Sequence, residues 1–345
     1  MPRAPNDRRP DAHETAGEEA LIAEYWAPLA AGFPGAYGLK DDCATIEPPA
    51  GNEFVVTTDA LIEGVHFFPA ARAGDVAWKA LAVNVSDLVA KGATPLAYVM
   101  HVALPSVDHV WLASFAAGLA AAQSAFGCSL AGGDTDRTPG PLTVSITAFG
   151  SVPKSSMVQR ATARPNDLVY VSGTIGDAAL GLALRREPHL RSRWNLDDAA
   201  CRSLEAKFSR PHPPVALAPA VLANASAAMD VSDGLMKDFA RLCRASEVGG
   251  RLEAARMPLS VPARSVVATD ADMLERLMSG GEDYETLACV PPENAARFEQ
   301  QAEQVGTRVT CIGAIDTSAA GIAAIGVAGA PMHFTKTGWD HFLVR

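Results

Sequence analysis

Short strand patterns alternate with helical patterns along both halves of this chain. Residues 53–58 (EFVVTT) are β-branched, as in a buried strand, and residues 75–91 repeat apolar side chains at helical spacing. This alternation predicts an α/β or α+β architecture. Further helices are predicted at 19–30, 111–126, 177–185 and 235–244, and further strands at 97–104, 142–150, 168–172 and 284–290.

The length of 345 residues exceeds what one ordinary hydrophobic core supports, so two domains are expected. Residues 153–167 carry basic residues, prolines and little apolar periodicity, which predicts a boundary there. The expected organisation is a flexible tail (1–16), an N-terminal domain (17–152) and a C-terminal domain (153–345). The tail lacks the apolar core of a signal peptide, which favours a cytoplasmic protein.

The formal net charge of −10 argues against nucleic acid and against an anionic membrane surface as partners. The uncharged stretch 110–133 is rich in Ala, Gly and Ser, too weakly hydrophobic for a bilayer helix, so it predicts a helix inside a domain running into a short strand. Six cysteines show neither a C-x-x-C pair nor zinc spacing, which predicts reduced, mostly buried thiols.

Acidic residues recur where the predicted elements begin and end. They lie beside small, flexible or hydroxylated residues, in the segments KDDCA, TTDALIEGVHF, NVSDLVAKGA, AGGDTD, MDVSDGL and SGGEDYE. Asp carboxylates supported by Thr and Ser hydroxyls are suitable ligands for several Mg²⁺ ions around phosphates. If these segments converge, the protein is a phosphoryl-handling enzyme in which metal admits an anionic substrate to an acidic cleft.

Each segment also has a simpler interpretation. Asn84 and Asp87 share a helix face and could form an ordinary solvated stripe. The AGGDTD segment could be a common Gly-Gly-Asp turn, or its glycines could let backbone amides approach a phosphate while Asp134 holds a cation. In MDVSDGL, Ser232 or Asp233 could cap the following helix. That leaves Asp230, and whichever of Ser232 and Asp233 does not cap, unexplained at a helix N-terminus that favours phosphate.

Several common enzyme signatures are absent. No Walker A sequence is present, so ATP use would fall outside the P-loop class, and no G-x-S-x-G hydrolase signature occurs. The segment VSGTIGD lacks the G-x-G-x-x-G spacing and is interpreted as a tight strand-to-helix turn.

Seven segments taken in order resemble one family. GLKDDCATI, VVTTDALIEGVHF, WKALAVNVSDLVAKGATP, AGGDTDR, QRATARPNDLVYVSGTIGD, MDVSDGLMKDFARL and SGGEDYETL are similar to the thiamine-monophosphate kinases, members of the PurM-like superfamily related to aminoimidazole ribonucleotide synthetase. The resemblance extends over about Glu18 to Trp339, nearly the whole chain.

The resemblance implies a two-domain PurM-like fold, with an N-terminal domain that forms an intersubunit β-barrel in a homodimer and a C-terminal α/β domain. It implies direct in-line transfer of a phosphoryl group from ATP to thiamine monophosphate, assisted by several Mg²⁺ ions. The implied metal ligands are Asp42, Thr57, Thr58, Asp59, Asp87, Asp134, Asp230 and Asp233. The implied nucleotide contacts are Gly133, Asp134, Arg160 and Ser232. The implied substrate contacts are His66, Glu282 and Trp339. Catalytic roles fall on Asp59, Asp87, Asp134, Asp233 and Arg160.

The chain departs from the family pattern at two lysines. Lys40 replaces a usual Gly and is expected to point to solvent, and Lys91 replaces a usual apolar residue. The segment 185–210 has no assigned role. Two alternatives remain open: another PurM-like ATP-dependent enzyme, of the selenophosphate or aminoimidazole ribonucleotide synthetase type, and a non-catalytic nucleotide-binding maturation protein. A selenophosphate synthetase should carry a reactive Cys or selenocysteine in a mobile N-terminal glycine-rich segment, and none is evident here. A maturation protein often ends in a reactive C-terminal Cys, whereas this chain ends in HFLVR.

Overall fold

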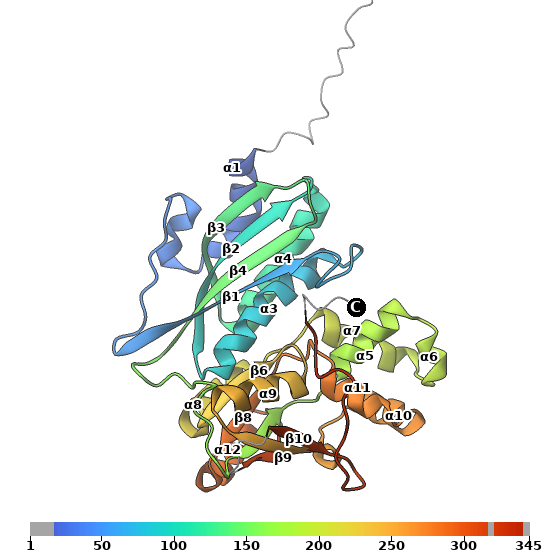
Figure 1. Ribbon diagram of the computed structural model, residues 1–345. Helices are drawn as coiled ribbons and strands as arrows, with labels where there is room; N and C mark the ends of the chain where they lie inside the picture. Colours follow the sequence, from blue (N-terminus) through green and yellow to red (C-terminus); the bar gives the residue numbers. More distant parts are fainter. Residues whose placement is uncertain (1–16, 317–320, 341–345) are drawn as a thin grey trace, which may run out of the picture.

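The computed structural model describes residues 17–316 and 321–340, and the predicted flexible tail 1–16 lies outside them. Figure 1 shows two β-sheets, each with its own helices, one above the other. The helical stretch predicted at 19–30 is confirmed as α1 (Glu18–Leu21), a π-helical turn (Ile22–Trp26) and α2 (Ala27–Ala30).

The N-terminal half contains a four-stranded sheet. Its strands are β1 (Asn52–Ile62), β2 (Thr94–Leu104), β3 (Ser129–Arg137) and β4 (Thr143–Pro153). The order across the sheet is β1-β4-β2-β3, so β1 and β3 form its edges. Strand β1 extends beyond the predicted 53–58 because its antiparallel pairing with β4 continues to Ile62.

Two long helices pack against each other beside this sheet: α3 (Ala73–Ala90) and α4 (His109–Phe126). Asp108 begins α4 as its N-cap, because its carboxylate accepts hydrogen bonds from the Val110 and Trp111 amides at 2.9 and 3.1 Å. A left-handed Gly127 ends it, as expected for a C-terminal glycine. No helix in the described part of the chain is long and apolar enough to cross a membrane.

The strand β3 corrects the interpretation of AGGDTD as a turn. The strand continues through these residues to Arg137, paired in parallel with β2 and with a register shift between Tyr98 and Val99. A Cβ on Gly133 would lie 1.9 Å from the Met100 carbonyl oxygen, so only glycine allows this close backbone approach. Gly133 therefore serves a tight strand pairing.

The C-terminal half contains a six-stranded sheet. Its strands are β5 (Leu168–Ser172), β6 (Ala227–Val231), β7 (Gly249–Glu253), β8 (Glu285–Val290), β9 (Val309–Asp316) and β10 (Ile322–Ile325), in the order β10-β7-β9-β5-β8-β6. Its helices are α5 (Asp177–Arg186), α6 (Leu190–Arg193), α7 (Asp198–Ser209), α8 (Ala218–Asn224), α9 (Leu235–Ala245), α10 (Val261–Thr269), α11 (Met273–Ser279) and α12 (Pro292–Gln304). The VSGTIGD segment is the tight turn from β5 to α5, as predicted, with Gly176 left-handed at the helix start.

Helix α3 joins the two halves. It is buried nearly all round, because one side meets the first sheet and the other contacts β6, β8 and α7 of the second half. Figure 1 shows it descending from the upper sheet toward β6. Residues on this helix are therefore placed at the boundary between the halves. The six cysteines are free thiols and four of them are buried, in agreement with the sequence.

Candidate active site

A cavity of about 660 Å³, here called the central cavity, opens between the two halves. The end of β1 and the turn after it contribute Asp59 and His66. The C-terminal half contributes the loop after β6, the GGEDYE segment and the chain near its end. The predicted site residues among its lining are Asp59, His66, Ser232, Asp233, Glu282 and Trp339.

Helix α3 places polar residues directly behind Asp59. The Asn84 side-chain oxygen accepts a hydrogen bond from the Asp59 amide at 3.0 Å, and the Thr57 hydroxyl donates to Asp87 Oδ2 at 2.6 Å. Asn84 is fully buried, so the interpretation of this helix face as an ordinary solvated stripe is wrong. Asn84, Asp87 and Lys91 follow one another at helical spacing and form a polar row along α3.

The carboxylates of this region lie close enough to perturb one another. Asp59 is open to the cavity but flanked by protein on its other sides, and desolvation, followed by the charges of Asp87 and Asp233, raises its pKa to about 7. Burial and then the nearby Asp87 raise the pKa of Asp230 well above its usual range, although the Ser86 hydroxyl donates to Asp230 Oδ2 at 3.0 Å. Carboxylate and hydroxyl oxygens are ligands that Mg²⁺ prefers, and a bound Mg²⁺ would offset the mutual repulsion of these carboxylates.

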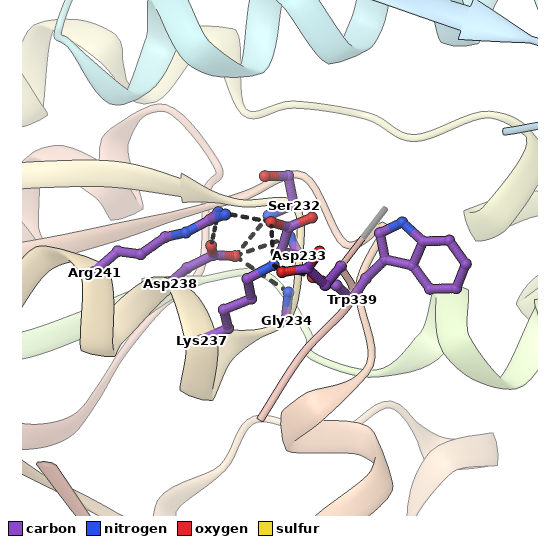
Figure 2. A network of polar contacts seen from close by, with 8 residues as sticks. Ser232, Asp233, Gly234, Lys237, Asp238, Arg241 and Trp339 are labelled. Carbon is purple, nitrogen blue, oxygen red and sulfur yellow. Dashed lines mark hydrogen bonds and ion pairs between the residues drawn. The ribbon is translucent and has the colours of Figure 1, made fainter. Parts of the chain in front are cut away.

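The loop at residues 232–234 is held by a carboxylate that the sequence interpretation missed. Asp238 Oδ2 accepts hydrogen bonds from the amides of Ser232, Asp233 and Gly234 at 3.1, 2.9 and 3.2 Å (Figure 2). Asp238 is fully buried, and burial, followed by the charge of Asp233, raises its pKa to about 6. The prediction that Ser232 or Asp233 caps α9 is therefore wrong: an acidic residue in the first turn reaches back to the loop amides instead.

Two basic side chains pair with the Asp233 carboxylate. Lys237 Nζ lies 3.0 Å and Arg241 Nη1 2.6 Å from Asp233 Oδ2. Lys237 also donates to the Trp339 carbonyl, and the Trp339 amide donates to the Asp233 carbonyl at 2.8 Å. Figure 2 shows the indole of Trp339 pointing away from this polar network. The backbone near Trp339 is thus fixed to the acidic loop while its ring remains on the cavity wall.

Other predicted residues lie elsewhere. Thr58 points to the opposite face of β1 from Thr57 and Asp59, as strand alternation requires, and its hydroxyl donates to the Ile146 carbonyl at 3.1 Å. A separate cavity of about 270 Å³, here called the edge cavity, lies beside β3 and shares no lining residue with the central cavity. The predicted site residues that line it are Asp42, Gly133 and Asp134.

Arg160 lines neither cavity but lies near the end of the polar row. Burial, followed by the charge of Arg160, lowers the pKa of Lys91 to about 8. Lys91 Nζ donates to the Ala228 carbonyl of β6 at 2.6 Å, so this departure from the family pattern is a contact between the halves. Lys40 is exposed, as expected.

Part of the segment 185–210 forms the cavity wall. Arg186 on α5 and Phe208 on α7 line the central cavity, and the Phe208 ring packs edge-on against Phe68 at a centroid distance of 5.9 Å. The sequence offered only a weak signal for these residues, because an arginine and an aromatic residue in a polar stretch are equally common on a solvated helix.

Comparisons with known proteins agree with this fold. The family described as AIR synthase related protein, N-terminal domain, matches residues 40–152, and AIR synthase related protein, C-terminal domain, matches residues 164–324. Thiamine-monophosphate kinase of Escherichia coli O157:H7 is 37% identical over 329 residues, which cover 94% of this chain and 98% of that protein.

Solved structures are similar over most of the chain. The crystal structure of thiamine-monophosphate kinase from Stenotrophomonas maltophilia K279a has a TM-score of 0.76 at 34% identity, covering 85% of this chain and 91% of that chain. The structure of AaThiL complexed with AMPPCP and TMP has a TM-score of 0.73 at 28% identity, covering 88% and 91%. The predicted two-domain PurM-like fold is confirmed. The chain therefore belongs to the thiamine-monophosphate kinase family, within the AIR synthase related proteins.

Proposed function

We propose that this protein transfers the γ-phosphoryl group of ATP to thiamine monophosphate, giving thiamine diphosphate and ADP in the cytoplasm. The observation that carries the proposal is the central cavity, where acidic residues of both halves meet the side chains of His66, Glu282 and Trp339. A similar protein, AaThiL, is complexed with AMPPCP, an ATP analogue, and with TMP.

One group of residues around the central cavity would hold Mg²⁺ ions: Thr57, Asp59, Asp87, Asp230 and Asp233. The other predicted ligands are not gathered with it, because Asp42 and Asp134 line the edge cavity and Thr58 points to the other face of β1, at the opposite edge of the sheet from that cavity. When bound, the ions would supply positive charge against the nucleotide phosphates and orient their oxygens.

The protein groups position the reactants. The attacking atom is an ionised phosphate oxygen of thiamine monophosphate, so no residue has to remove a proton, and in-line transfer requires no covalent nucleophile. The polar row on α3 leads from Asn84, which accepts a hydrogen bond from the Asp59 amide, to Lys91 beside Arg160. Arg160 and Ser232 would contact the nucleotide, with Arg160 offsetting the charge of its phosphates. Gly133 and Asp134, the other predicted nucleotide contacts, line the edge cavity and are not brought together with Ser232 within one chain.

Incubation of the purified protein with ATP, Mg²⁺ and thiamine monophosphate should yield thiamine diphosphate and ADP in equal amounts, with little turnover of free thiamine. An alcohol acceptor would need a positioned general base, whereas the phosphate oxygen does not. Chromatographic separation of the products checks this. Rapid phosphorylation of thiamine, with none of its monophosphate, would contradict the proposal.

Trp339→Ala is expected to raise KM for thiamine monophosphate about threefold to thirtyfold and to leave KM for ATP nearly unchanged. An indole face attracts the thiazolium cation with roughly 0.5 to 2 kcal/mol. Steady-state kinetics with each substrate varied in turn measure this. Trp111→Ala serves as the control and should lower only Tm. Trp111 lies in the N-terminal half, away from the central cavity, and its ring stacks on Phe115 with 4.9 Å between the ring centroids. A fall in Tm alone for Trp339→Ala would make Trp339 a structural residue.

The N-terminal half is expected to form a homodimer. Strands β1 and β3 are unpaired edges within the chain, and β1 exposes Phe54 and Val56, with 55% of Val56 accessible. Light scattering should give twice the chain mass of 36.0 kDa. Val56→Asp should dissociate the dimer, whereas Val305→Asp, exposed in the other half, should not. A wild-type monomer at micromolar concentration would refute this expectation.

A further inference from the structure

Lys79 on α3 is the buried cation at the centre of this inference. Only 1% of the residue is exposed. Its Nζ donates to the His66 carbonyl at 3.0 Å, pairs with Glu282 Oε2, and lies 4.0 Å from the centroid of the Phe208 ring. One ammonium thus contacts the turn after β1, the GGEDYE segment and α7.

A buried ammonium is tolerated only where its charge is compensated and its protons are accepted. The Glu282 carboxylate supplies the charge, the His66 carbonyl accepts a hydrogen bond, and the Phe208 ring offers its negative face. All three partner residues line the central cavity. The charge of Lys79 therefore fixes three parts of the cavity wall relative to α3.

The Glu282 backbone is itself constrained. Its φ is +78°, a conformation unfavourable for a residue with a side chain, and its amide donates to the Ser232 carbonyl at 2.8 Å. The ion pair with Lys79 adds a restraint on the side chain. Glu282 thus presents a carboxylate that is oriented and already neutralised by a cation.

We propose that Lys79 is a positioning residue for substrate recognition, and that it makes Glu282 a directed hydrogen-bond acceptor for thiamine monophosphate instead of a free negative charge. The acceptor fits the N–H groups of the aminopyrimidine, while the thiazolium charge is met by the Trp339 ring. This inference rests on the proposed function and specifies how the same site recognises its substrate.

Arg210 offers a matched control. It also links the end of α7 to α3 through a cation: its guanidinium lies 4.3 Å from the centroid of Trp78 and 3.5 Å from Asp75 Oδ1. None of these three residues lines the central cavity. Arg210→Met therefore removes a comparable contact between the halves without altering the substrate wall.

The test is a double-mutant cycle with Lys79→Met and Glu282→Gln. Each single substitution should raise KM for thiamine monophosphate by about tenfold, with kcat changed less than about threefold and KM for ATP unchanged. The double substitution should be no worse than about tenfold, because both changes disrupt one shared contact. Arg210→Met should leave both KM values unaltered.

Two results would overturn the inference. One is a KM for thiamine monophosphate about a hundredfold above wild type in the double variant, which would mean that the two residues act independently; the other is an Arg210→Met variant with the same rise in KM as Lys79→Met. Each single substitution leaves one charge of the buried pair without its partner, whereas the double variant leaves neither. Should a single variant fail to fold, the double variant decides the question: a KM for thiamine monophosphate about tenfold above wild type supports the inference, and a wild-type KM or a rise of about a hundredfold contradicts it. A wild-type protein that does not phosphorylate thiamine monophosphate contradicts the proposed function, and this inference with it.

Discussion

Asp59→Ala, Asp87→Ala and Asp233→Ala should each lower kcat by about 10²- to 10³-fold, the usual loss when one group that stabilises transition-state charge is removed. Each carboxylate lies in the acidic group shared by β1, α3 and the loop after β6, and each would hold a cation against the transferring phosphate. Single-turnover and steady-state rates at saturating Mg²⁺ and ATP measure the effect. Asp272→Ala, an exposed acidic residue, should keep the wild-type kcat.

Two of these substitutions should change Tm in opposite directions when the protein is melted without metal. Asp59→Ala should raise Tm by about 1–4 °C, because it removes a carboxylate repelled by Asp87 and Asp233. Asp233→Ala should lower Tm, because it leaves Lys237 and Arg241 without their shared partner. If any of the three variants retained near wild-type kcat at saturating Mg²⁺, the assignment of that residue as a metal ligand would be wrong.

Asp238→Ala is expected to have the largest effect on stability. The substitution leaves the amides of Ser232, Asp233 and Gly234 without their acceptor in a buried position, a change of about 3 kcal/mol, or roughly 6–12 °C in Tm. Turnover should fall as well, because the loop that carries Asp233 loses its support. Thermal unfolding monitored by circular dichroism measures the shift.

Arg244→Ala provides the control for this prediction, because it removes an exposed side chain near the end of the same helix. Its effect should remain within about 0.5 kcal/mol. A wild-type Tm for Asp238→Ala would show that solvent or a neighbouring group satisfies the loop amides and that the buried carboxylate is not their essential acceptor.

Helices, strands and turns that depend only on their own residues could be predicted from the sequence. The periodicity of α3, the β-branched run of β1 and the glycine turn before α5 needed no knowledge of partners. The course of β3 could not be predicted in this way, because Gly132 and Gly133 suggest a turn until the strand pairs with β2. Such pairing joins residues far apart in the sequence.

Residue type alone indicated part of the candidate site. Asp59 and Asp233 are found near one another because carboxylates beside strand and helix ends converge at the boundary between the halves. Lys79 was missed because a lysine in an apolar helix resembles a solvated residue until Glu282 lies against it. The separation of Asp134 from the central cavity depends on the sheet order, which no single motif contains.

The central claim is that thiamine monophosphate binds between the two halves, beside the acidic group of β1 and α3. Crystals grown with AMPPCP, thiamine monophosphate and Mn²⁺ in place of Mg²⁺ test it through anomalous scattering. The expected map shows Mn²⁺ peaks at Asp59, Asp87 and Asp233, with the thiamine rings in the central cavity against Trp339. Thiamine monophosphate bound outside this cavity, or a cavity with no Mn²⁺ peak at these carboxylates, would contradict the account.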